Sequence, residues 1–74
     1  MNVTEEFLHK IRQLDGFNNA IITNIDVFTR KKVVCFYLVT DLAYSESVLP
    51  EAEEIAEAYM PAGFAAVVHA EKRT

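Results

Sequence analysis

The sequence predicts a small α+β domain in which two helices lie mainly on one face of a three-stranded sheet. Segments with the apolar spacing of helices alternate with segments rich in β-branched and aromatic residues, at 20–28, 33–40 and 64–70, which gives the order α-β-β-α-β. The segment 33–40 is apolar on both faces and leads straight into a helix. With 74 residues, the chain has room for one core. We therefore expect a single domain over residues 1–74, either on its own or as part of a larger protein.

The first helix is predicted from a stripe of apolar residues at helical spacing: Phe7, Leu8, Ile11 and Leu14. Asn2, followed three residues later by Glu5, fits a capping box at its start. Asp15 and Gly16 are expected to end it, because glycine adopts the left-handed conformation without a Cβ clash.

The next two strands are predicted to form a hairpin around a four-residue turn, Thr29–Lys32. Pairing Phe28 with Val33 sets the rest of the register. One face then holds the pairs Val27–Val34, Ile25–Phe36 and Thr23–Leu38, and the other face holds Asp26–Cys35 and Asn24–Tyr37. The first face is the more apolar, so we expect the helices to cover it.

The second helix has a predicted buried stripe of Val48, Ala52, Ile55, Ala56 and Tyr59 and a solvent-facing set of Glu51, Glu53, Glu54 and Glu57. Ser45 or Ser47 is the expected cap, and Pro50 fits its first turn. A third strand follows Pro61 and Gly63, with residues 71–74 as a frayed tail. A right-handed crossover should lead into this strand, and we expect the sheet order 2-1-3, with the first strand in the middle.

Net charge, cysteine content and the length of apolar runs limit the classes of function that the chain can have. The net charge of −4 disfavours binding driven by phosphate neutralisation. A lone Cys35 in so small a domain favours a reducing, cytoplasmic location. The longest apolar run, 33–39, falls far short of the roughly 20 residues of a membrane-spanning helix, and we expect no membrane partner.

The sequence contains no convincing catalytic, cofactor or metal constellation. The helix carboxylates are expected to be solvated rather than to form an acid–base pair. Cys35 and His69 share the parity of the uncovered face, but the 2-1-3 order would separate their strands, and two such residues do not make a zinc site. His9 is expected to have a packing or surface role. We therefore predict that this domain is not itself an enzyme and holds no cofactor.

The uncovered sheet face is the strongest candidate for a functional surface. Its predicted residues are unusually apolar: Ile22, Phe28, Val33, Tyr37, Val39 and Val67. An open antiparallel face is normally polar, so this pattern indicates docking of a partner. The other interpretation is that the first helix crosses to this side and covers part of it. Three consecutive cations at the hairpin tip, Arg30, Lys31 and Lys32, could contact phosphate or simply protect the hairpin edge.

One family resembles this chain over roughly residues 17–71. The segments Phe36–Asp41 and Ala43–Glu46, then Tyr59-Met60-Pro61 and Gly63-Phe64, are similar to the N-terminal region of the C-type alpha subunit of DNA polymerase III, the replicative polymerase of low-GC Gram-positive bacteria. That region resembles K-homology-like modules, which also occur in the bacterial initiator protein and the clamp-loader tau subunit. The resemblance implies an accessory role in DNA replication, with a replisome subunit or other domains of the parent chain as partner.

The polymerase and exonuclease carboxylates of that family lie in other domains, outside the region that this chain resembles. Any DNA-directed DNA polymerase activity would therefore belong to the parent chain. K-homology domains that bind single strands use a Gly-x-x-Gly loop, and the only two glycines here are Gly16 and Gly63. Aromatic residues for base stacking are limited to Phe28, Tyr37 and Tyr44.

The leading hypothesis is therefore a non-catalytic interaction domain that docks a protein partner. The predicted docking residues are Phe28, Tyr37 and Val39, with Arg30, Lys31 and Lys32 at the rim. Two alternatives stay open: a single-stranded nucleic-acid-binding module that uses the basic tip and the same aromatics, and a free-standing small protein that dimerises through its sheet.

Overall fold

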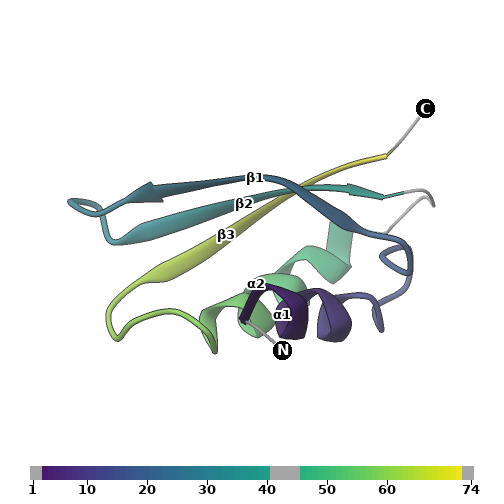
Figure 1. The fold of residues 1–74 in the computed structure, drawn as a ribbon, viewed down its shortest axis with the longest axis horizontal. Helices are drawn as coiled ribbons and strands as arrows, with labels where there is room; N and C mark the ends of the chain where they lie inside the picture. The colour runs from purple at the N-terminus through teal and green to yellow at the C-terminus, as the bar shows by residue number, and fades with distance from the viewer. Residues whose placement is uncertain (1–2, 41–45, 73–74) are drawn as a thin grey trace.

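The computed structural model describes residues 3–40 and 46–72 and shows two helices beneath a twisted three-stranded sheet (Figure 1). Its elements are α1 (Val3–Ile11), β1 (Ile21–Phe28), β2 (Val33–Thr40), a 3₁₀ helix η1 (Glu46–Val48), α2 (Leu49–Glu57) and β3 (Ala65–Lys72). The order agrees with the predicted α-β-β-α-β, with the short η1 added. β3 continues to Lys72, so the expected fraying from residue 71 was wrong.

The predicted 2-1-3 strand order was also wrong. The sheet has the order β1-β2-β3, with β1 antiparallel and β3 parallel to β2. The physical reason lies in composition: β2 is apolar on both faces, and a central strand, flanked on both edges, buries such a sequence best. β1 instead carries Asn24 and Asp26 and is mostly exposed.

The hairpin register is confirmed from Phe28–Val33 to Asn24–Tyr37, and the turn spans the predicted four residues. The predicted pairing of Thr23 with Leu38 was wrong, because the register shifts between Ile22 and Asn24 and Ile22 pairs with Leu38. This bulge turns the Ile22 side chain toward the helices, where it is half-buried against the core. On the uncovered face, Ile21 takes its place: Ile21 pairs with Val39 and is 41% exposed.

The turns and helix ends follow the sequence in part. The first helix ends at Ile11, so its predicted end at Asp15 and Gly16 was wrong, although Gly16 has the expected positive φ of 86° in the turn that follows. Lys32 closes the hairpin turn at a φ of 55°. The N-cap of α2 is Val48, without a side-chain cap hydrogen bond, so Ser47 is not the cap residue. The predicted caps Asn2 and Ser45 lie outside the described residues, as does Tyr44.

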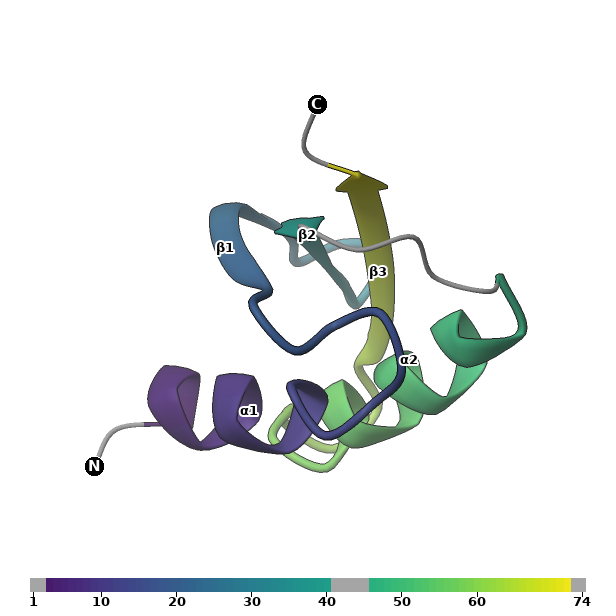
Figure 2. The ribbon, with the colours of Figure 1, turned by 90° about the vertical axis from the view of Figure 1, so that its right-hand side faces the viewer.

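The core lies between the helices and β2 and β3. Both helices pack on the same side of the sheet, so α1 does not cross to the far face (Figures 1 and 2). α2 packs against β3, α1 packs against α2, and the Phe7 and Phe36 rings lie 5.0 Å apart. The buried apolar residues are Phe7, Ile11, Phe17, Ala20, Val34, Phe36, Leu38, Ala52, Ala56, Ala66 and Val68. This arrangement leaves the helix-facing side of β1 without a helix against it.

Candidate functional site

The exposed apolar surface gathers at β1. Val27 and Ile25, whose pairing with Val34 and Phe36 places them on the helix-facing side, are 59% and 39% exposed. Phe28, on the opposite side, is 44% exposed. Large apolar side chains at this exposure remain in contact with water unless a partner covers them. β1 is therefore the least covered strand of the sheet.

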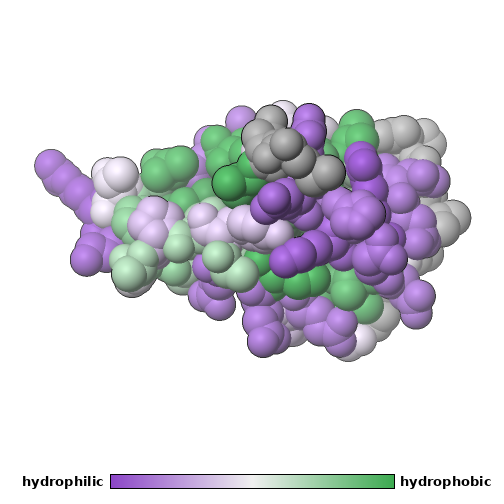
Figure 3. All heavy atoms as spheres, turned by 60° about the horizontal axis from the view of Figure 1, so that its bottom comes forward, coloured by the Kyte–Doolittle hydropathy of each residue, from purple (hydrophilic) through white to green (hydrophobic). Residues whose placement is uncertain are grey.

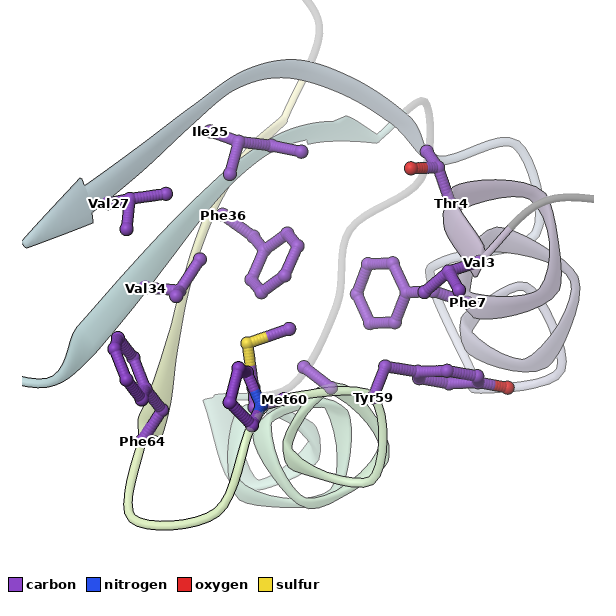
Figure 4. A pocket seen from close by; sticks show the side chains of 12 residues that line it. Val3, Thr4, Phe7, Ile25, Val27, Val34, Phe36, Tyr59, Met60 and Phe64 are labelled. Atoms are coloured by element: carbon purple, nitrogen blue, oxygen red, sulfur yellow. The ribbon is translucent and has the colours of Figure 1, made fainter. Parts of the chain in front are cut away.

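An apolar groove of about 350 Å³ runs along the helix-facing side of β1 (Figure 4). Ile25 and Val27 form one side, and the start of α1 with Phe7 faces them. Its lining residues are Val3, Thr4, Phe7, Ile25, Val27, Val34, Phe36, Ala56, Tyr59, Met60, Pro61 and Phe64. The residues of this groove come from both helices, two strands and the segment that leads into β3, so it forms only in the folded chain.

The chemistry of the groove is that of hydrophobic burial. Its lining offers two side-chain hydroxyl groups, on Thr4 and Tyr59, and no ionisable carboxylate, imidazole or amine. Burying apolar surface there is worth roughly 25 cal/mol per Å². Figure 3 shows hydrophobic side chains between the hydrophilic hairpin tip at the left end and the hydrophilic helix surfaces. A polar rim around an apolar centre is typical of a docking surface.

The open sheet face, predicted as the docking surface, carries the predicted polar residues beside its apolar ones. Tyr37 stacks on His69 with ring centroids 5.1 Å apart and an angle of 12° between the rings. Asp26 also lies beside Tyr37, and Asn24 donates a 3.3 Å hydrogen bond to the Asp26 carboxylate. Tyr37 and Val39 are half-buried between their neighbours, whereas Arg30, Lys31 and Lys32 are exposed at the tip.

Cys35 and His69 were predicted to lie on strands separated by a third, and that was wrong, because β2 and β3 are neighbours. Cys35 pairs with Val67, two pairs before Tyr37–His69, so the thiol and the imidazole share one face. The His69 ring stacks on Tyr37. Within residues 3–40 and 46–72, no group of three or more His, Cys, Asp or Glu residues is placed to hold a metal ion.

Glu53 was predicted to face solvent, and the structure corrects this. It is half-buried, and one carboxylate oxygen accepts a 3.0 Å hydrogen bond from the backbone N–H of Val68. The carboxylate thereby covers part of the outer edge of β3. No pattern in the sequence indicates this contact, because it depends on β3 being an edge strand beside α2.

The Tyr37 hydroxyl gives a prediction about stability at high pH. Partial burial raises the pKa of Tyr37 above its ordinary value of 10.0, and the Asp26 carboxylate and Cys35 add to the rise. The contribution of Tyr37 is full below pH 10 and is lost as the pH rises through the raised pKa, because the unfolded chain ionises first. We expect the free energy of unfolding to fall over this range, and to fall less in Tyr37→Phe. Urea titrations at a series of pH values measure both, and parallel curves would contradict the prediction.

Comparisons of the chain with models of protein families, with curated proteins and with solved structures find no match. In the part of the chain that the structure describes, no helix is long and apolar enough to cross a membrane.

Proposed function

We propose that this chain is a non-catalytic protein-interaction domain. The observation that carries the proposal is the groove along β1, an apolar recess beside exposed Ile25 and Val27. An interaction domain of this kind buries an apolar anchor from its partner inside a polar rim. The lining offers two hydroxyl groups and no carboxylate, imidazole, amine or thiol beside them to activate a hydroxyl, which favours binding over catalysis.

The resemblance described above supports a more specific proposal. It would make the chain the cytoplasmic N-terminal module of a bacterial replicative DNA polymerase, with a replisome subunit or other domains of the parent chain as partner.

Two matched substitutions test which surface docks the partner. Val27→Asp places a charge at the groove, and Val39→Asp places one on the open face. We expect Val27→Asp to weaken binding of a purified replisome subunit by at least about tenfold, because the charge would lose its hydration on docking. Val39→Asp should leave binding nearly unchanged. Surface plasmon resonance measures both affinities, after circular dichroism has shown that each variant is folded.

The reverse result would place docking on the open face that the sequence predicts. Failure of every subunit of a Gram-positive replisome, and of the remaining polymerase domains, to bind would contradict the polymerase assignment.

The nucleic-acid alternative has one observation in its favour, the exposed basic tip beside exposed Phe28. It predicts amide NMR shifts on residues 28–39 when a single-stranded oligonucleotide is added, fading steeply with salt. Lys31→Glu combined with Lys32→Glu should abolish them. A spectrum that does not change at low salt would remove this alternative.

A further inference from the structure

The two edges of the sheet are protected differently. β1 and β3 are the edge strands. On β3, the Glu53 carboxylate occupies the Val68 N–H, and Glu71 and Lys72 add charge at the end of the strand. Open edges invite pairing with another strand, and proteins usually protect them with charges, proline or a covering element.

The sequence of β1 offers little such protection. Its eight residues include one charged side chain, Asp26, and no lysine or proline. The bulge at Thr23 disturbs the start of the strand, while Asn24 to Phe28 form a regular ladder with β2. Ile25 and Val27 are exposed on the side of the groove. β1 thus combines an unpaired backbone edge with an apolar flank, which is the combination that strand addition uses.

We propose that β1 pairs antiparallel with β1 of a second copy, across a two-fold axis at Ile25, to give a six-stranded sheet. This inference rests on the proposed function, because it adds a second copy at the edge of β1, beside the groove that docks the partner. It joins the two grooves into one apolar surface under the centre of the combined sheet. Dimers with two-fold symmetry are the commonest assemblies of identical soluble chains.

The register follows from side-chain direction and charge. To keep both grooves on one side, residues that face the groove must pair with each other, since paired residues project to the same face. An axis at Asp26 would set two carboxylates directly opposite one another, which is unfavourable. An axis at Ile25 pairs the two isoleucines and sets Asp26 opposite Asn24 of the second copy, whose side-chain amide can donate to it.

The distribution of charge favours a second copy as the occupant. α2, which carries Glu51, Glu53, Glu54 and Glu57, packs against β3 and not against β1 (Figure 2). The antiparallel arrangement also places the two basic tips, Arg30–Lys32, at opposite ends of the central strand pair. The glutamates of α2 therefore stay away from the contact, and Asp26, Glu5 and Glu6 are the acidic residues on the side of β1.

Sedimentation equilibrium of the folded chain from about 10 µM to about 1 mM tests the pairing. We expect a reversible dimer. Ile25→Lys should weaken it at least about tenfold, because two ammonium groups would meet at the axis. Ala65→Lys is the matched control, at an exposed position of β3, and should leave the dimer intact. Circular dichroism checks that both variants fold. A chain that stays monomeric, or equal effects of the two lysines, would overturn the inference.

Disulfide trapping tests the register independently of the lysine variants. In a Cys35→Ala background, Ile25→Cys should give a cross-linked dimer on mild oxidation. Val27→Cys should not, because the two thiols would lie four residues apart along the strands, about 13 Å, beyond the reach of a disulfide. Efficient cross-linking through position 27 alone would overturn the axis at Ile25. If the pairing fails while Val27→Asp still weakens binding of a replisome subunit, the interaction domain stands and only its self-pairing is wrong.

Discussion

Replacing Phe17 with alanine is expected to cost about 3–5 kcal/mol of unfolding free energy and to leave the chain largely unfolded near body temperature. Phe17 lies between α1 and β1, has no exposed surface and is among the largest fully buried side chains. Its backbone N–H donates to the Leu14 carbonyl, and its carbonyl accepts from Ala20, so the loop holds the ring in place. A domain of 74 residues has only about 4–11 kcal/mol of stability in total.

The matched control is Phe28→Ala, the same change at a phenylalanine that is 44% exposed. We expect it to cost well under half as much, because less surface returns to water and no cavity forms. Urea unfolding followed by circular dichroism gives both values. Equal losses of unfolding free energy in the Phe17 and Phe28 variants would contradict the buried position of Phe17.

The second large effect is expected at Glu53. Removing its carboxylate with Glu53→Ala should cost about 1–3 kcal/mol, because the Val68 N–H loses its hydrogen-bond acceptor at a partly buried edge. Glu53→Gln keeps an acceptor oxygen and should cost less. Native-state hydrogen exchange offers a local measurement, in which the Val68 amide should lose protection in Glu53→Ala.

Glu54→Ala is the control for this prediction, since Glu54 is an exposed glutamate on the same helix. It should change stability by less than about 0.5 kcal/mol. If the two alanine variants unfold at the same urea concentration and the Val68 amide exchanges equally in both, the carboxylate contributes nothing to the edge.

The local elements could be predicted because local patterns determine them. The apolar spacing of α1, the alternation in β1 and the run in β2 each identify their element. The hairpin register followed from the turn length, as far as Asn24. The order of the strands was harder, since it depends on which strand can bury two faces. The clue was present, because β2 is apolar on both faces and that pattern suits a central strand.

Other features lie beyond such patterns. No glycine near Thr23 indicates the bulge in the sequence, yet the bulge moves the Ile22 side chain to the other face of the sheet. Phe17 lies in the loop between α1 and β1, where no helical or strand periodicity indicates that it is buried. Glu53 fits the solvent-facing spacing of its helix, and only its position beside β3 gives it a partner. The candidate site shifted for the same reason: Ile25 and Val27 were assigned to the covered face, and the coverage stops short of β1.

The parallel neighbour of β2 has a consequence for synthesis on the ribosome. The chain emerges from its N-terminus, so the hairpin of β1 and β2 can close as soon as residue 40 is available. The other edge of β2 stays unpaired until β3, which follows α2 in the chain, has been synthesised. During that interval the most apolar strand of the domain has an open edge. Slower translation of residues 41–64 would lengthen this interval and with it the opportunity for nascent chains to aggregate.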